Sequence, residues 1–412
     1  MTADGLTRRF VLLRALRWLP VGLVLPFLVI TPESRGLSLG EIGAVFAVHS
    51  CVVIALEVPS GALADTVGRR RVLLVGALLT AVSLAVFAVA EGIAAFMGSV
   101  ALLATGRALI SGALEAWYVD SLRSLDPAAP LSHGLSRGTA AEGVAMAFGA
   151  LAGGALVTLA GYGAAAIAGA LAALAYLAAV AALVGEPRVR PRTSEAHESV
   201  AARAREVFRT ARAEAAASVA VRVVFLTGVA MGMSFTAVEL LWQPRLGDLL
   251  DHGNAHGIVF GALAAGSMLA VAAGASASPT LRRRIGLRLG YLVALAFGAV
   301  CIALLGAPGS PAAFALVYLL AYLGLGVADP MHFELLNDAV GPTARATLIS
   351  AESLAAQGGA LGANLSVGVL ASTRGPGLAW ALAGILLALA TGAAAVRLYQ
   401  VRSRKVTDQR IS

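Results

Sequence analysis

The stretch Gly61-Ala-Leu-Ala-Asp65-Thr-Val-Gly68-Arg69-Arg70-Arg71 lies between two long apolar runs of the 412-residue chain. Each run is long enough to cross a bilayer, so the polar residues between them are predicted to form a short loop at a membrane face. Gly68 permits a tight reversal, and Gly61 allows helices to approach closely. Asp65 is expected to cap the start of a facing helix, where the helix dipole favours negative charge. The three arginines cross a bilayer only at high cost, which places this loop at the cytoplasmic face.

The composition extends this prediction to the whole chain. Hydrophobic residues make up 58% of the sequence and charged residues only 13%. Apolar runs of about 20 residues, the length that crosses a bilayer as a helix, recur from one end to the other without strand-like alternation. We therefore predict an all-α integral membrane protein with twelve spans, at residues 10–30, 40–64, 71–91, 94–122, 136–160, 163–184, 218–242, 255–277, 285–306, 311–338, 345–372 and 377–399.

The net charge of +8 does not indicate nucleic-acid binding here, because the arginines concentrate in segments on one side of the predicted membrane. That bias predicts a multi-pass protein of the plasma membrane with both termini in the cytoplasm. Cys51 and Cys301 both lie inside apolar runs, which argues against a disulfide or a metal site. No phosphate-binding loop, metal motif or nucleophile motif is present, so we expect neither an enzyme nor a cofactor.

The two halves of the chain resemble each other. Residues 274–284 align without gaps on residues 61–71, and the pattern Gly112-x-x-Glu115-x4-Asp120 recurs as Gly326-x-x-Asp329-x4-Glu334. Glu142 and Glu352 also occupy matching places in the fifth and eleventh spans. This repeat predicts four segments: an N-terminal six-helix bundle at 1–184, a cytoplasmic linker at 185–217, a C-terminal bundle at 218–400 and a cytoplasmic tail at 401–412.

The 61–71 stretch resembles the signature loop of the major facilitator superfamily, G-x-L-a-D-r-x-G-r-r, with Thr66 where an arginine is usual. The segment Glu115-Ala-Trp-Tyr-Val-Asp120 resembles the E-A-W-x-x-D segment of a mostly bacterial subgroup. The resemblance implies two pseudo-symmetric six-helix bundles and a secondary transporter that works by alternating access. The implied partners are a small-molecule substrate, protons and the lipid bilayer, with the chain acting as a monomer.

Ionisable residues inside apolar spans are costly and are site candidates by default. Steps of four predict that Arg107, Ser111 and Glu115 share one helix face. Arg107 resembles the fourth-span arginine of proton-coupled members of the superfamily. It could hold an anionic group, act on a neighbouring carboxyl, or form a structural pair with one. A carboxyl in an apolar setting favours its neutral form, so Asp329 is a candidate proton carrier. The full set of proton-coupling candidates is Asp329, Glu115, Arg107 and Glu142.

Other candidates are assigned by their place along the spans. Arg17 could line the cavity or extend its charge to the inner face, and His332 could relay protons one turn from Asp329. The substrate-cavity candidates are Arg17, Trp18, His49, Ser111, His332, Glu239 and Trp242. Structural pairing is expected for Asp120, Glu334, Asp338 and Glu352, with Asp120 bracing the arginines of the signature loop. A conformational role is expected for that loop, through Gly61, Asp65, Gly68, Arg69, Arg70 and Arg71.

These features predict proton-coupled efflux of a small amphipathic or drug-like molecule. The glycines Gly149-x-x-x-Gly153-Gly154 resemble part of the signature of drug/proton antiporters, although close helix packing explains them equally well. The alternatives are proton-coupled uptake or facilitated diffusion of a small polar solute, and lipid movement or sensing without solute transport.

Overall fold

The computed structural model describes residues 2–126, 129–185, 200–250, 256–341 and 344–411, and the side chains at 58, 61–62, 65, 200–204, 346 and 400–411 lie outside that description. The described chain is helical and contains no strand. Its elements are α1 Ala3–Val24, η1 Leu25–Phe27, α2 Ile30–Ser34, α3 Leu39–Val67, α4 Arg69–Val89, α5 Gly92–Ile110, α6 Ala113–Leu125, α7 Leu131–Ala160, α8 Tyr162–Leu183, α9 Val200–Ala217, α10 Val219–Leu249, α11 Gly257–Ile285, α12 Leu287–Leu304, α13 Pro311–Ala339, α14 Arg345–Arg374 and α15 Pro376–Ile411.

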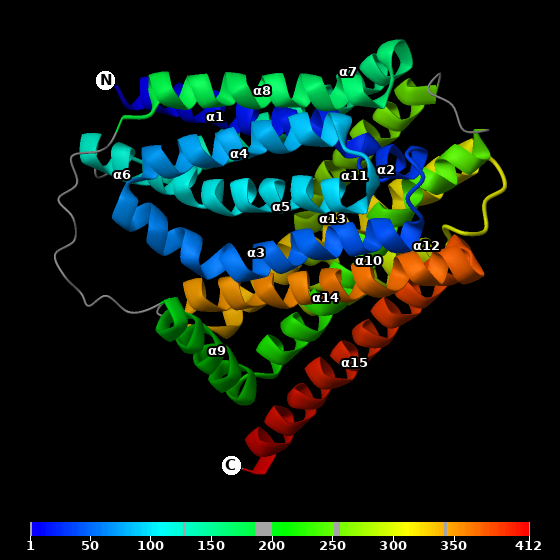
Figure 1. Cartoon of the computed structure of the whole chain (residues 1–412). Helices are drawn as coiled ribbons and strands as arrows, with labels where there is room; N and C mark the ends of the chain where they lie inside the picture. Colours follow the sequence, from blue (N-terminus) through cyan, green and yellow to red (C-terminus); the bar gives the residue numbers. More distant parts are fainter. Residues whose placement is uncertain (1, 127–128, 186–199, 251–255, 342–343, 412) are drawn as a thin grey trace. The chain divides into compact units, whose positions relative to one another are not determined.

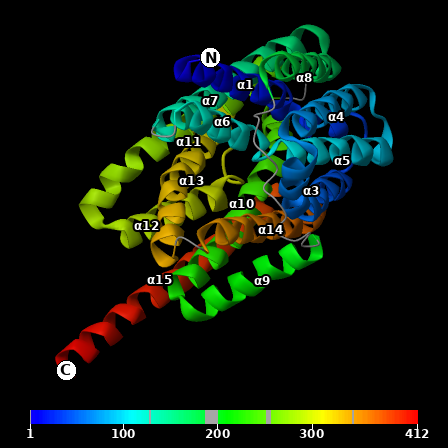
Figure 2. The same ribbon diagram turned by 90° about the vertical axis from the view of Figure 1, so that its left-hand side faces the viewer.

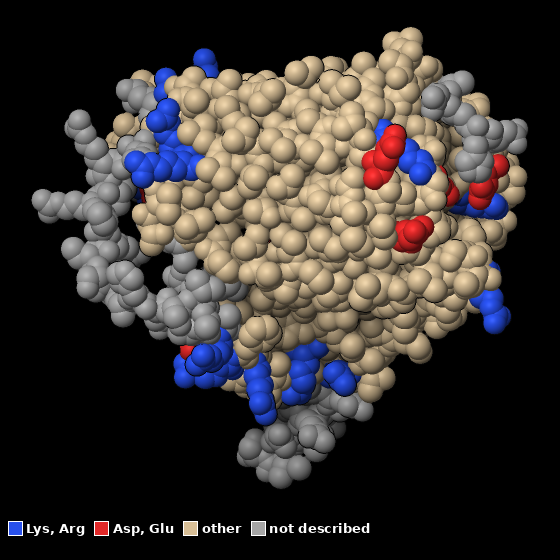
Figure 3. All heavy atoms as spheres, viewed as in Figure 1, with Lys and Arg blue, Asp and Glu red and all other residues tan. Residues whose placement is uncertain are grey.

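Twelve of the described helical segments are long and apolar enough to cross a membrane, which confirms the predicted fold class. Figure 3 shows the same property on one face, where the surface over α4 and α5 carries almost no charged side chain and the charged side chains lie around its edges. Part of the predicted linker, residues 186–199, lies outside the described residues. The rest of it forms α9, and α15 continues through the predicted tail to Ile411.

The chain divides into two compact units. Unit 1 contains residues 1–37, 48–200 and 250–265, and unit 2 contains residues 38–47, 201–249 and 266–412. In unit 1, α1 packs against α7 and α8, and α4 packs against α5 and α8 (Figure 1). In unit 2, α10 packs against α14 and α15, and α12 packs against α13 and α15 (Figure 2). The predicted domain boundaries remain a proposal.

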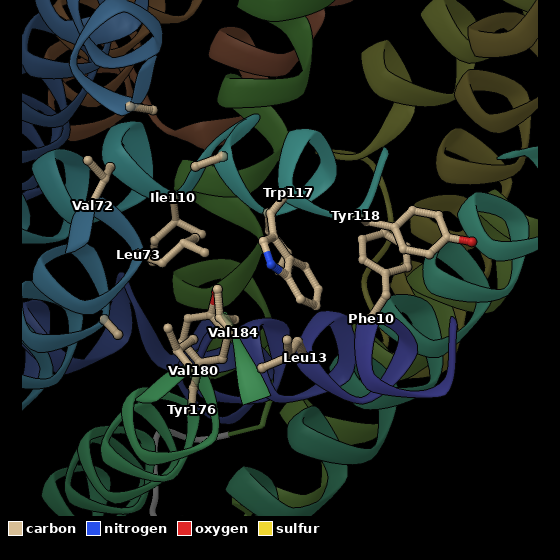
Figure 4. Packing of buried hydrophobic residues seen from close by; sticks show 14 of the residues in the cluster. Phe10, Leu13, Val72, Leu73, Ile110, Trp117, Tyr118, Tyr176, Val180 and Val184 are labelled. Atoms are coloured by element: carbon tan, nitrogen blue, oxygen red, sulfur yellow. The ribbon is translucent and has the colours of Figure 1, made fainter. Parts of the chain in front are cut away.

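The core of unit 1 forms where α1, α6 and α8 meet. Figure 4 shows Phe10 stacked on Tyr118, with ring centroids 4.2 Å apart. Trp117 is buried beside them and donates from its indole nitrogen to the carbonyl of Gly185 at 2.9 Å. The amphipathic pattern of α6 thus places its apolar face in the core, while Glu115 and Asp120 lie on its more accessible side.

The signature stretch is more helical than the predicted loop. Helix α3 continues to Val67, and only Gly68, with φ of +99°, separates it from α4. In the second half, Leu281 aligns with Gly68, and α11 continues through it to Ile285 and turns at Gly286, with φ of +84°. The turn falls at a glycine because a leucine does not tolerate the positive φ that the reversal requires.

Aligned residues of the two halves nevertheless form equivalent ion pairs. In unit 1, Arg69 on α4 pairs with Asp120 on α6, the partner expected from the sequence. In unit 2, Arg282 on α11 pairs with Glu334 on α13 at 2.5 Å. Of the other signature residues, Arg70 donates to the carbonyl of Ala181 at 2.7 Å and Arg71 is exposed. The side chains of Gly61 and Asp65 lie outside the described residues.

The predicted fourth span is not one continuous helix. Helix α5 ends at Ile110, Ser111 is extended with ψ of 126°, and Gly112 is left-handed with φ of +74°. Helix α6 then begins at Ala113. The prediction that Arg107, Ser111 and Glu115 share a face through steps of four was therefore wrong, because a left-handed residue redirects the chain. The matching tenth span has no such interruption, since α13 passes through Gly326 and Pro330.

Glycines set the crossing of α1 and α7. A Cβ atom on Gly22 would lie 2.5 Å from the Met146 carbonyl oxygen, and one on Gly149 would lie 2.9 Å from the Leu23 amide nitrogen. A Cβ on Gly153 would overlap the carbonyl oxygen of Leu23. These contacts favour the packing interpretation of the fifth-span glycines over the antiporter signature.

We expect Gly153→Ala to destabilise the protein and Gly143→Ala on the same helix to leave it as stable or more stable. Alanine favours a helix over glycine by about 1 kcal/mol. At Gly153 this gain is outweighed by a clash with backbone that costs roughly 1–3 kcal/mol. A Cβ on Gly143 meets nothing within 4 Å. Thermal unfolding in detergent checks this difference, and equal midpoints for the two variants would contradict it.

Candidate functional site

A chain of hydrogen bonds connects four helices in the interior of unit 2. The Tyr291 hydroxyl on α12 donates to Thr227 Oγ1 on α10 at 2.6 Å and lies 2.8 Å from His332 Nδ1 on α13. The other ring nitrogen, Nε2, lies 2.9 Å from Glu352 Oε1 on α14. All four residues are buried, and Glu352 is the most accessible at 7% exposure. The structure thus brings the relay candidate His332 together with Glu352, which the sequence predicted only as a structural acid.

The bond directions determine how many protons this chain holds. Thr227 Oγ1 donates its single hydrogen to the Val223 carbonyl at 2.8 Å, so it accepts from Tyr291. The hydroxyl hydrogen of Tyr291 is then used in the bond to Thr227. His332 Nδ1 must therefore carry a hydrogen and donate it to the Tyr291 oxygen. In this arrangement, one further proton lies between Nε2 and Glu352, on an imidazolium or on a carboxylic acid.

The same heavy atoms also permit a second arrangement with one proton fewer. If the Thr227 hydroxyl rotates toward Tyr291, then Tyr291 donates to Nδ1 of a neutral His332. The ring donates from Nε2 to an ionised Glu352. Both arrangements satisfy every contact in the chain, and they differ by one proton. The network can therefore take up or release a proton while keeping all the hydrogen bonds between its four side chains, and only the Thr227 bond to the Val223 carbonyl is exchanged for one to Tyr291.

Asp329 lies one turn before His332 on the same helix. Its side chain is exposed, and it makes no hydrogen bond or ion pair with the described residues. The charges of His332 and Glu352 act on it electrostatically. An exposed carboxyl one helical turn from a buried proton-holding network is a candidate to exchange protons with that network.

Unit 1 contains a different arrangement, in which the acids already have cationic partners. Arg14 on α1 pairs with Glu115 on α6 and with Glu142 on α7. Arg17, one turn further along α1, lies 3.4 Å from the same oxygen of Glu115. All four side chains are partly buried, between 13% and 28% exposed. Glu115 and Glu142, predicted as proton carriers, therefore differ from Asp329 in being held by guanidinium groups.

The remaining cavity candidates of unit 1 lie around these ion pairs. Arg17 packs over the ring of Trp18, with its guanidinium carbon 5.4 Å from the ring centroid. Arg107 is exposed, and its charge acts on His49 on α3. Ser111 is exposed at the break between α5 and α6. Arg107 thus acts electrostatically on His49, and Arg17 in turn acts on Arg107.

Glu239 and Trp242 lie in an aromatic cluster of unit 2. The Tyr322 hydroxyl donates to Glu239, and Tyr322 packs on Tyr318 with ring centroids 4.7 Å apart. Trp242 packs on the other side of Tyr318 at 5.3 Å. Asp338, for which pairing was expected, is exposed and forms no ion pair with the described residues.

Sequence reasoning missed the neutral members of these sites. Thr227, Tyr291 and Tyr322 lie in apolar runs, where threonine and tyrosine are common and give no local signal. Arg14 was not among the site residues predicted from the sequence. Its two partners lie more than 100 residues away in the sequence, so only the tertiary fold reveals the pairing.

The fold and these sites define a polytopic membrane protein with buried charges in both halves, the class to which secondary transporters belong. The family model of the Major Facilitator Superfamily matches residues 10–363, and the chain belongs to this superfamily. It is therefore a secondary transporter of small molecules, not an enzyme. A sequence search of curated proteins found no match.

Solved structures of two kinds of transporter share the fold. The nucleoside transporter NupG superposes with a TM-score of 0.78 at 14% identity, covering 95% of this chain and 99% of that one. A mutant of the peptide transporter POT in complex with sulfate gives 0.77 at 15%, covering 97% and 95%. The POT family transporter PepTSo gives 0.73 at 12%, covering 97% and 98%. At these identities the likeness shows the fold alone.

Proposed function

We propose that this protein is a proton-coupled transporter that exports a small amphipathic organic molecule by alternating access. The observation that carries the proposal is the Thr227–Tyr291–His332–Glu352 network, which can exist in two fully hydrogen-bonded forms that differ by one proton. Coupling requires that the protonated and deprotonated forms favour different conformations. The exposed, unpaired Asp329 supplies a route between this network and solvent.

The membrane orientation and the oligomeric state of the protein belong to the same proposal. The arginine distribution supports a plasma-membrane location with both termini in the cytoplasm. We propose a monomer, with the domain boundaries given above and membership of the subgroup that has the E-A-W-x-x-D segment. The export direction rests on the amphipathic cargo expected from the sequence, and proton-coupled uptake is the alternative.

The test is transport into proteoliposomes with an imposed pH gradient. The probes are a matched panel of amphipathic dyes that are permanently cationic, neutral or acidic, together with a nucleoside and a dipeptide. We expect at least one amphipathic probe to accumulate in an acidic lumen, as exchange for protons requires, and a protonophore to abolish the accumulation. Protein-free liposomes correct for passive partition, and the Asp329→Asn variant should lose the response of transport to the pH gradient.

Three other results would overturn parts of the proposal. Accumulation in an alkaline lumen would show that solute and protons move together, which contradicts export but retains coupling. Transport that does not change with the gradient would contradict coupling itself, and headgroup-dependent movement of labelled lipid with no solute flux would contradict solute transport.

A further inference from the structure

The break between α5 and α6 leaves backbone groups without helical partners inside a predicted span. The amide of Ala116 is bonded to the Gly112 carbonyl, so the amides of Ala113, Leu114 and Glu115 have no acceptor within α6. No side chain caps this end of the helix. Within a membrane, such backbone is tolerated only where it lines a water-filled cavity or is buried in protein. Ser111 and Gly112 are exposed, which indicates the first case.

The last turn of α5, which directly precedes the break, carries an arginine that forms no ion pair with the described residues. Arg14 and Arg17 are occupied by Glu115 and Glu142, whereas Arg107 forms no ion pair or hydrogen bond with the described residues. The charges of Arg17 and Glu57 act on Arg107, and the effect of Arg17 is the larger. The charge of Arg107 in turn acts on His49. Near the break, therefore, one guanidinium remains available to a ligand.

A second observation also indicates a ligand. The hydroxyl of Tyr176 on α8 is buried and has no hydrogen-bond partner among the described residues, and the residue is only 2% exposed. The charges of Arg17 and Glu115 act on this phenol. Tyr176 also packs in the same hydrophobic cluster as Ile110 and Ala113, the residues on either side of the break (Figure 4). The Trp18 indole nitrogen, beside Arg17, lacks a partner as well.

We propose that the break forms an anion-binding subsite for the carboxylate, phosphate or sulfonate group of an organic cargo. Arg107 supplies the charge, the first-turn amides of α6 and the Ser111 hydroxyl supply further donors, and the Tyr176 hydroxyl donates from the buried side. Trp18 contacts the rest of the molecule. The transported molecule of the proposed function is then an amphipathic organic acid. The identification of the bound ligand as the transported molecule rests on that proposed function.

The test measures ligand binding without transport, through thermal stabilisation of the purified full chain. The probes are four compounds with one aryl group: an arylacetate, an arylphosphonate, the neutral arylacetamide and an arylalkylamine. Inorganic phosphate is the fifth probe. We expect the two acids to stabilise the wild-type protein and the amide and amine to have little effect. Arg107→Gln should weaken binding of the acids at least about tenfold, as loss of a charged hydrogen-bond partner does.

Two variants distinguish the site from a general effect of charge. Arg107→Lys keeps the charge and should retain most of the binding. Arg137→Gln removes an exposed arginine on α7 in the same unit and should leave binding unchanged. The inference is overturned if the amide stabilises as well as the acids, if no acid stabilises, or if Arg107→Gln binds acids normally. Equal stabilisation by phosphate and the arylphosphonate would also overturn it, since the site would then take inorganic anions.

This experiment separates the inference from the proposed function. Binding of acids that depends on Arg107, without any proton-coupled transport, would contradict only the proposed function. Proton-coupled transport of cationic or neutral probes, without binding of acids, would contradict only the subsite.

Discussion

Glu352→Gln will abolish gradient-driven accumulation of a probe that the wild-type protein concentrates, while exchange at equal pH on both sides continues. The reason is that Glu352 is the final acceptor of the buried network, and an amide cannot share a proton with His332 Nε2 as a carboxylate does. The accumulation ratio should fall at least about tenfold, toward equal concentrations, because a hydrogen bond to a charged group is lost. The measurement is uptake into proteoliposomes with and without a pH gradient.

Asp338→Asn is the matched control, since it removes an exposed acid from α13 in the same unit. It should keep full accumulation. Tyr291→Phe is the intermediate case: it interrupts the chain at its centre but retains the His332–Glu352 pair, so it should move the pH dependence of transport without removing it. Normal accumulation by Glu352→Gln would place the coupling proton elsewhere.

Arg14→Met will destabilise the protein more than any single change of its two acidic partners. The substitution leaves Glu142 without a cation among the described residues and leaves Glu115 with only the longer contact to Arg17. Removing one partner from a buried pair costs about 3–5 kcal/mol, and the partial exposure of these side chains places this case near the lower end, at about 3 kcal/mol. The measurement is unfolding of the purified protein in detergent.

A combined variant tests whether unpaired charge causes this loss. Adding Glu115→Gln and Glu142→Gln to Arg14→Met removes both orphaned carboxylates and should restore most of the stability. If the triple variant is no more stable than Arg14→Met alone, the loss arises from packing of the arginine side chain and not from its charge.

The sequence predicted those parts of the fold that depend on local pattern. Long apolar runs and the arginines between them defined the spans, and the internal repeat correctly aligned Arg69 with Arg282 and Asp120 with Glu334. The break at Gly112 was not predicted, because one glycine within an apolar run is compatible with a continuous helix. The preceding Ser111 is the available signal, since a Ser-Gly pair often marks a turn.

The sites were predicted in part, because charge is visible in a sequence and partnership is not. Asp329, Arg107, Glu115, Glu142, His332 and Glu352 were all identified as ionisable residues in spans. Which of them pair depends on helices that are distant in sequence. Arg14 forms ion pairs with both Glu115 and Glu142, whereas Arg107 and Asp329 make no ion pair with the described residues. That difference distinguishes structural charge from charge that can act on a proton or a ligand.

The most direct test of the proton network is ¹⁵N NMR of the histidine-labelled protein across a pH series, with the signal assigned through His332→Gln. On acidification, we predict that Nδ1 of His332 changes from a hydrogen-bond acceptor to an N–H donor, and that the change occurs over the pH range in which transport responds. A His332 ring that keeps one neutral tautomer throughout that range would contradict the account.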